Sequence, residues 1–283
     1  DLTFPIDQLG DDAGILTQIA SGSHPVSKLL RESDRPILII GQGPLQHPDA
    51  HAILNSAYKI ADSYGFISQD WNGYNVLHTA AARVGGLDVG FVPGPNGLDV
   101  SNMLNAANNG EIEVIYLLGA DEIDMNKLDS AFVIYQGHHG DAGANSADVI
   151  FPGAAYTEKN ATWVNTEGRP QRTKRAIFPP GNAREDWAII RALSEELGHT
   201  LPYNSLGELR SALGAAHPSI GAVDVIKPSA WKPFGVSGNI GALPLTNALK
   251  DFYLTNSICR ASDTMAKCSS AFSSNKLENL VNG

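Results

Sequence analysis

Two adjacent histidines and an aspartate form the segment of this sequence whose side chains best suit chemistry. His138, His139 and Asp141 follow a run of apolar residues that predicts a buried strand. Open α/β sheets bind ligands at the carboxyl ends of their strands, and imidazoles and carboxylates can ligate a metal or transfer protons. Neighbouring residues rarely point the same way, however, and this loop lacks the H-x-H and H-x-x-x-H spacings. A loop that hydrogen-bonds its own backbone and a neighbour is therefore the favoured interpretation.

A second polar stretch surrounds Trp163. Its polar residues include Glu158, Asn165, Glu167, Arg169 and Gln171, and the first four are candidate site residues. It leads into residues 168–184, where the charged side chains are all basic, namely Arg169, Arg172, Lys174, Arg175 and Arg184. In a chain with a formal net charge of −10, this local basic patch could bind an anionic cofactor or an acidic partner surface. A solvated loop explains the same pattern equally well.

A glycine pair follows the first predicted strand, at the place where a dinucleotide-binding fingerprint would lie. Gly41 and Gly43 fit the first two glycines of G-x-G-x-x-G, but position 46 holds Gln46 instead of the third. Pro44 also removes one N–H group that could hold a phosphate. A plain tight turn from strand to helix is the favoured interpretation.

The composition excludes several kinds of site. With two cysteines in 283 residues, Cys259 and Cys268, the sequence cannot supply the four thiolates of an iron–sulfur cluster or a Cys-rich zinc site. The acidic balance argues against a dedicated nucleic-acid binder, which needs basic charge to displace counterions from phosphates. No apolar run approaches the roughly 18 residues of a membrane helix. No G-x-S-x-G elbow is present, so serine hydrolysis has no support.

Strands that alternate with helices predict an α/β fold with a parallel sheet. Continuous apolar runs rich in β-branched residues are typical of strands buried on both faces, and they occur at residues 36–40, 114–118, 131–135 and 148–151. Helical spacing of apolar residues predicts helices from about residue 49 and over 185–197 and 257–272. Alanine-rich composition predicts another over 74–84, and further helices are expected over 98–107 and 206–213.

Composition shifts divide the chain into five segments. A lead-in over residues 1–33 precedes the α/β parallel-sheet domain at 34–152. The remaining segments are a polar loop with helices that pack back on that core, a Pro/Gly-rich extended arm, and a carboxyl-terminal helix with a tail, at residues 153–214, 215–250 and 251–283.

Long stretches of the sequence resemble the large iron–sulfur subunit of mitochondrial respiratory complex I, the NADH:ubiquinone oxidoreductase. The stretches that carry the resemblance include Tyr-Gln-Gly-His-His-Gly-Asp at 135–141 and Asn-Thr-Glu-Gly-Arg at 165–169, with further matches at 147–159, 183–187, 191–195, 251–258 and 265–268. More distantly, the strand followed by Asn-x-Glu-Gly-Arg resembles the molybdopterin-dependent oxidoreductases, such as formate dehydrogenase.

The resemblance implies a Rossmann-like fold of the molybdopterin-oxidoreductase type and a place in the carboxyl-terminal half of the complex I subunit. In the mitochondrial subunit the pterin cofactor has been lost, and the iron–sulfur clusters are expected in the amino-terminal half. This chain would then hold no cofactor, metal or catalytic residue of its own. The resemblance also implies a position in the peripheral arm, on the matrix side of the mitochondrial inner membrane, beside the cluster-binding half and other peripheral-arm subunits.

On this interpretation, the polar candidate residues are packing or subunit-contact elements, which applies to His138, His139, Asp141, Glu158, Asn165, Glu167 and Arg169. Two alternatives stay open. The chain could be a catalytic fragment of a molybdopterin-dependent oxidoreductase. Its basic residues over 168–184 and the loop with His138 and His139, the histidine loop, would then hold a pterin. It could also be a nucleotide-binding module that uses Gly41 and Gly43.

Overall fold

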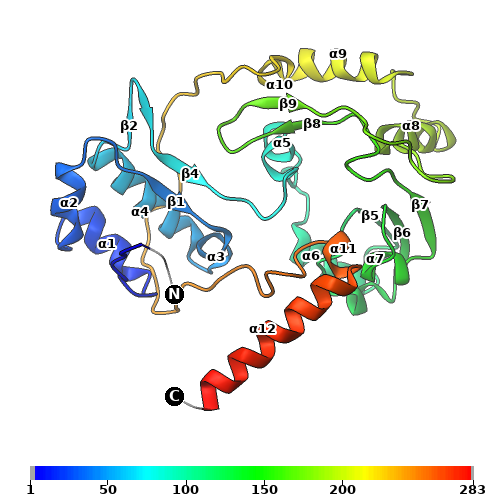
Figure 1. The fold of residues 1–283 in the computed structure, drawn as a ribbon. Helices are drawn as coiled ribbons and strands as arrows, with labels where there is room; N and C mark the ends of the chain where they lie inside the picture. Colours follow the sequence, from blue (N-terminus) through cyan, green and yellow to red (C-terminus); the bar gives the residue numbers. More distant parts are fainter. Residues whose placement is uncertain (1–3, 282–283) are drawn as a thin grey trace. The chain divides into compact units, whose positions relative to one another are not determined.

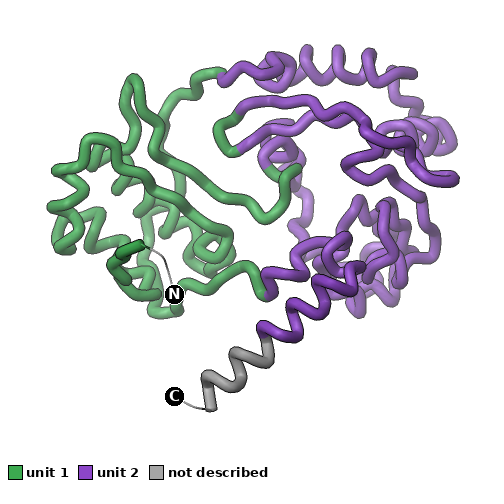
Figure 2. Tube along the Cα trace, viewed as in Figure 1, with its two compact units in different colours: residues 1–83, 166–168, 227–250 green, residues 84–165, 169–226, 251–283 purple. Residues whose placement is uncertain are grey.

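The computed structural model describes the backbone of residues 4–281 and the side chains of residues 4–272. The chain forms two compact units (Figure 2). Unit 1 comprises residues 1–83, 166–168 and 227–250, and unit 2 comprises residues 84–165, 169–226 and 251–283. The boundary at residue 84 lies inside the α/β domain expected over 34–152, so the predicted strands of that domain divide between the two units.

Unit 1 combines a pair of short parallel strands with helices. Its elements are α1 (Gly14–Ser21), α2 (Val26–Glu32), β1 (Leu38–Ile40), α3 (Gln42–Gln46), α4 (Ala50–Ser63), β2 (Ile67–Ser68), β3 (Trp71–Asn72) and β4 (Tyr74–Val76). Strand β1 pairs with β4 in parallel, whereas β2 and β3 form an antiparallel hairpin (Figure 1). Ile60 and Phe66 lie in its buried core, because the apolar face of α4 turns towards α1 and the strands.

Of the extended arm expected over 215–250, Pro218–Gly221 form the short helix α10, and residues 227–250, here called the arm, pack on unit 1. Trp231 stacks on Tyr58 with ring centroids 5.4 Å apart. Gly43 is buried beneath the arm, and a Cβ atom at this position would overlap the carbonyl oxygen of Thr246. The second glycine of the Gly41–Gly43 pair is therefore explained by the close approach of another backbone.

A three-stranded parallel sheet forms the centre of unit 2. Its strands are β5 (Val114–Leu118), β6 (Phe132–Gly137) and β7 (Val149–Pro152), in that order across the sheet. One face packs against α6 (Val100–Asn108) and the short helix η1 (Met125–Leu128) through a buried apolar cluster of Ala107, Leu117, Leu128, Val133 and Tyr135. These strands confirm the three apolar runs predicted at 114–118, 131–135 and 148–151, and the α/β fold is confirmed with them.

The rest of unit 2 consists of one hairpin and helices that range from 4 to 19 residues. These elements are α5 (Arg83–Asp88), which starts at the unit boundary, α7 (Ala142–Asn145), β8 (Thr162–Val164), β9 (Pro170–Arg172), α8 (Asp186–Glu196), α9 (Leu206–Ala216), α10 (Pro218–Gly221), α11 (Ser257–Arg260) and α12 (Asp263–Val281). Residues 222–256, all of them described, contain neither helix nor strand apart from an isolated bridge between Asp12 and Pro244. Within the described chain, no helix is long and apolar enough to cross a membrane.

Two predicted helices are wrong. Residues 74–76 form β4 instead of the start of a helix over 74–84, because their backbone pairs with β1. The helix predicted over 257–272 is interrupted between α11 and α12. There the Ser262 hydroxyl accepts a hydrogen bond from the Met265 amide at 3.4 Å, which begins a second helix. The side chains of the tail expected over 273–283 lie outside the described residues.

Candidate functional site

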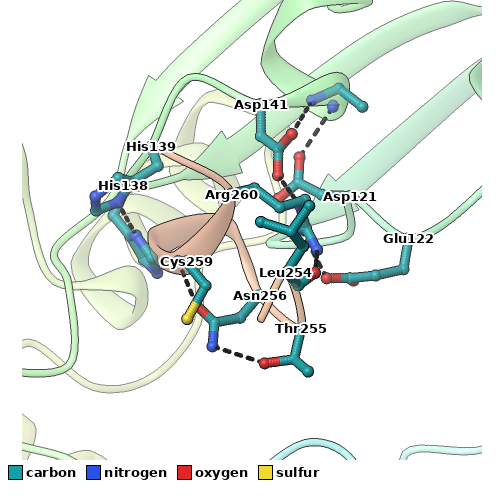
Figure 3. A network of polar contacts seen from close by, with 12 residues as sticks. Asp121, Glu122, His138, His139, Asp141, Leu254, Thr255, Asn256, Cys259 and Arg260 are labelled. Carbon is teal, nitrogen blue, oxygen red and sulfur yellow. Dashed lines mark hydrogen bonds and ion pairs between the residues drawn. The ribbon is translucent and has the colours of Figure 1, made fainter. Parts of the chain in front are cut away.

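Polar side chains gather at the carboxyl edge of the parallel sheet in unit 2 (Figure 3). The segment after β5 supplies Asp121 and Glu122, and the loop after β6 supplies His138, His139 and Asp141. Parallel strands end at the same edge, so the two segments meet there. This edge is where open α/β sheets bind their ligands, and it is therefore the candidate site.

A guanidinium group from the carboxyl-terminal region occupies this edge. Arg260, the last residue of α11, donates from Nε to Asp141 Oδ2 at 2.6 Å and from Nη2 to Glu122 Oε1 at 2.9 Å. Its Nη1 also donates to the Leu254 carbonyl oxygen at 3.4 Å. Burial opposes the charge of Arg260, but the bonds to the two carboxylates outweigh it and raise the pKa of the guanidinium. We call this arrangement the Arg260 clamp.

Asp121 fixes the interior of the same edge. Its Oδ1 accepts a hydrogen bond from the Gly143 amide and its Oδ2 accepts one from the Tyr135 hydroxyl, both at 2.9 Å. Burial, and then the bond to Asp121, raise the pKa of Tyr135. A Cβ atom on Gly137 or Gly143 would overlap the Tyr135 ring. Gly137 at the end of β6 and Gly143 in α7 thus leave space for the buried ring of Tyr135.

The two histidines contact each other at the surface of the loop. The Nδ1 atoms of His138 and His139 lie 2.6 Å apart, and the rings meet edge to face. One Nδ1 must carry the hydrogen and the other must accept it, so at least one ring is neutral in this geometry. Desolvation, followed by the charges of His139 and Lys159, lowers the pKa of His138. Among the described residues, no group of three or more His, Cys, Asp or Glu side chains could hold a metal ion.

A second set of polar contacts connects the sheet to the start of α8. The Gln136 amide donates to Asp186 Oδ1 at 2.8 Å, and the Lys159 ammonium pairs with Asp186 Oδ2. The Tyr116 hydroxyl donates to Gln136 Oε1. Burial and the charge of Asp186 raise the pKa of Tyr116. Both the nitrogen and the oxygen of the buried Gln136 side-chain amide therefore have hydrogen-bond partners, as buried polar groups require.

The other predicted site residues belong to different elements. Glu158 accepts a hydrogen bond from the Ala155 amide at 3.0 Å, in the turn after β7. Asn165 accepts one from the Arg169 amide at 3.0 Å across the β8–β9 hairpin, and Arg169 Nη1 donates to the Asp224 carbonyl oxygen at 2.7 Å. Glu167 is exposed in the turn of that hairpin. Of the seven predicted residues, the structure brings His138, His139 and Asp141 together at the sheet edge.

Sequence reasoning missed the residues that complete the site, which are Asp121, Glu122, Asp186 and Arg260. Arg260 lies 119 positions from Asp141, and no local spacing signals a contact of that range. Asp121 and Glu122 could have been predicted, because they follow a strand predicted from an apolar run. The same position after a predicted strand identified His138, His139 and Asp141 as candidates.

Comparison with known proteins confirms the resemblance seen in the sequence. Residues 1–196 match the family model of molybdopterin oxidoreductases, and residues 225–268 match the model of the carboxyl-terminal region of the NADH-ubiquinone oxidoreductase G subunit. The NADH-ubiquinone oxidoreductase 75 kDa subunit of Reclinomonas americana is 45% identical over 282 residues, which is 97% of this chain and 40% of that protein.

Two further relatives show the same coverage. The NADH-quinone oxidoreductase G subunit of Rickettsia bellii is 40% identical over 94% of this chain and 37% of its own length. The mitochondrial NADH dehydrogenase [ubiquinone] iron-sulfur protein 1 of Solanum tuberosum is 41% identical over 95% of this chain and 36% of its own. The chain thus spans well under half the length of these relatives. Because the first family model covers more than half of it, the chain belongs to the molybdopterin oxidoreductase family, in which it is similar to subunits of NADH-ubiquinone and NADH-quinone oxidoreductase.

Proposed function

We propose that this chain is the cluster-free, structural portion of the large iron–sulfur subunit of respiratory complex I. It supports electron transfer from NADH to ubiquinone as a scaffold in the peripheral arm, on the matrix side of the mitochondrial inner membrane. The names of the relatives support this proposal, because they are subunits of NADH-ubiquinone or NADH-quinone oxidoreductase and that of Solanum tuberosum is designated mitochondrial. On this proposal, its partners are the cluster-binding portion of the subunit and other subunits of the arm.

The Arg260 clamp is the observation that carries the structural role. The edge at which a family member would bind an anionic pterin cofactor presents three carboxylates, from Asp121, Glu122 and Asp141. Arg260 at this edge is engaged by Asp141, Glu122 and a backbone carbonyl, and nearby Lys159 is paired with Asp186. Carboxylates repel a phosphate-bearing ligand and these cations are already paired, so the residues at this edge do not fit the cofactor. Polar contacts within the chain at this edge support a scaffold role.

The cysteines do not fit an iron–sulfur cluster either. Cys259 and Cys268 are too few for a four-thiolate cluster, and in the described residues they do not gather with histidines into a group that could hold a cluster with mixed ligands. We therefore assign the clusters of the whole subunit to the portion of the relatives that this chain does not span. The histidine loop and the β8–β9 hairpin then act in packing and subunit contact.

One purification tests this proposal against the catalytic alternative. The tagged chain is purified from the cells that produce it, its co-purifying polypeptides are identified, and molybdenum, tungsten and iron are quantified. The proposal expects complex I subunits in stoichiometric amounts, with iron accounted for by companion polypeptides. Near-stoichiometric molybdenum or tungsten bound to the separated chain, or purification of the chain free of complex I subunits, would overturn it.

A further inference from the structure

An exposed loop in unit 2 carries large apolar side chains that the described chain leaves uncovered. We call residues 173–184, between β9 and α8, the basic loop (Figure 1). At its tip the side chain of Phe178 is 78% exposed and that of Ile177 is 57% exposed. Single exposed apolar residues are ordinary on protein surfaces, but two adjacent ones beside a cleft are typical of an interaction site.

The backbone of the basic loop is held in place. The Thr173 amide donates to the Ala161 carbonyl oxygen at 3.0 Å, and the Ala176 amide donates to the Thr157 carbonyl oxygen at 2.8 Å. The Arg175 amide donates to Asn160 Oδ1 at 3.1 Å. The exposed side chains therefore stand on an ordered support. Ordering the loop on binding would cost little, and this preorganisation favours affinity.

A cleft of about 440 Å³ opens beside the exposed tip. Phe178 and Trp187 contribute aromatic surface to its lining, and Pro179, Ala183 and Ala188 contribute aliphatic surface. A volume of this size lies in the range of pockets that accept a ligand group. The mostly apolar lining suits a large apolar side chain from a binding partner.

Two cationic residues, Arg175 and Arg184, belong to the lining of the cleft. The Arg175 guanidinium lies 4.2 Å from the centroid of the Phe178 ring, and Lys174, which precedes Arg175 in the chain, is exposed. Glu185, the acidic residue of the lining, is engaged by hydrogen bonds from the Trp187 indole at 2.8 Å and the Asn160 amide at 3.2 Å. The surface of the loop thus presents positive charge in a chain whose formal net charge is −10. Opposite charge on a partner would be attracted to it.

From these observations we infer that the basic loop is a docking site for an acidic segment of a neighbouring polypeptide. That segment inserts a large apolar side chain into the cleft beside Phe178 and pairs its carboxylates with Lys174 and Arg175. We commit to a protein partner over an anionic membrane surface, because the cleft, lined by Phe178 and Trp187, suits one large apolar side chain. The inference rests on the proposed function, since it names one contact of the scaffold within the assembly.

Zero-length cross-linking tests the contact in the intact assembly. Carbodiimide joins a lysine ammonium to a carboxylate only when the two groups touch, and mass spectrometry then identifies the pair. We expect Lys174 to link to an Asp or Glu of another polypeptide. Lys28 is the control, because it is exposed in unit 1 beside Glu32 at 4.0 Å and is expected to link within the chain. If the assembly is purified and Lys174 forms no link to another chain, the docking site is refuted while the proposed function stands.

A pair of matched variants tests the apolar anchor. Phe178→Ser removes the side chain at the cleft, and Phe91→Ser removes another phenylalanine of unit 2 that is 80% exposed. We expect Phe178→Ser to lower recovery of the polypeptide linked to Lys174 by about tenfold or more, as for a central aromatic anchor, and Phe91→Ser to leave it unchanged. Equal thermal unfolding of both variants and the parent chain checks folding. Unchanged recovery with Phe178→Ser, or binding of the chain to anionic phosphatidylserine vesicles that this variant abolishes, would overturn the inference.

Discussion

Replacing Arg260 by alanine removes the clamp that joins α11 to the carboxyl edge of the sheet. The side chain of Arg260 is 24% exposed and that of Asp141 is 18% exposed, so this ion pair is only weakly screened by water. A hydrogen bond between charged groups contributes about 1.5–3 kcal/mol. The Glu122 side chain is 60% exposed, and its pair with Arg260 adds less than about 1 kcal/mol.

Asp141 keeps one hydrogen bond when Arg260 is lost, because its Oδ1 also accepts from the Ala142 amide at 2.9 Å. The carboxylate is therefore not stranded, and the cost stays below the roughly 3–5 kcal/mol of a fully buried broken pair. We expect a loss of about 2–3 kcal/mol. At about 1.4 kcal/mol for each factor of ten, this corresponds to a roughly 30- to 150-fold increase in the opening of α11.

Hydrogen exchange followed by mass spectrometry measures this opening directly. The amides of Arg260 and Ala261 donate within the turn of α11, to Asn256 and Ser257, and they should exchange faster in Arg260→Ala by the factor above. Arg191→Ala is the control. Its side chain is similarly covered, at 17% exposed, but its partners lie around α8 and α9. If exchange in α11 is the same in Arg260→Ala as in the parent chain, the clamp does not hold the carboxyl-terminal region.

Three further changes test other parts of the structure. The pKa of His138 lies below its ordinary 6.5 in the folded chain, so the unfolded chain binds a proton more readily as the pH falls. The free energy of unfolding should therefore decline from about pH 6.5 downwards. His138→Gln should reduce the difference in the free energy of unfolding measured in urea at about pH 5.5 and about pH 7.5. Gly43→Ala should destabilise unit 1 by roughly 1–3 kcal/mol, because its methyl group overlaps Thr246, and limited proteolysis of the arm should accelerate. Tyr135→Phe should cost roughly 1–3 kcal/mol in chemical unfolding, since buried Asp121 loses one of its two donors.

The sequence predicted the parts of the fold that depend on local composition. The apolar run at 114–118 predicts a strand buried on both faces, and the structure confirms the strand as β5. Leu117 is buried, whereas Val114 and Leu118 are exposed, so burial on both faces is not found in the described chain. The helix predicted over 74–84 rested on alanine propensity, which amounts to a few tenths of a kcal/mol per residue. Pairing with β1 satisfies the backbone of residues 74–76 and overrides that preference.

The position of the candidate site could be predicted from the sequence, but the side-chain contacts within it could not. A loop after a buried strand marks the carboxyl edge of the sheet, and His138, His139 and Asp141 do lie there. The polar contacts at this edge depend on Arg260, which comes from a distant part of the chain and binds Asp141. Contacts of that length follow from tertiary packing, and no spacing rule for helices or strands encodes them.

The residues that resemble an active site and the residues that indicate a partner are therefore different sets. Asp121 binds the Tyr135 hydroxyl, Gly143 makes room for that ring, and Asp141 binds Arg260, so each has a structural reason for its type and position. Phe178 contacts the Arg175 guanidinium, but its ring stays largely exposed, and burying it would add stability that the described part of the chain does not use. Exposure alone does not distinguish Phe178 from Phe91, which is 80% exposed, but exposed Ile177 and a cleft with cationic lining adjoin Phe178. This combination is best explained by burial against another molecule. In a scaffold, function is located at such uncovered residues, and experiments on the basic loop therefore address it more directly than experiments on the histidines.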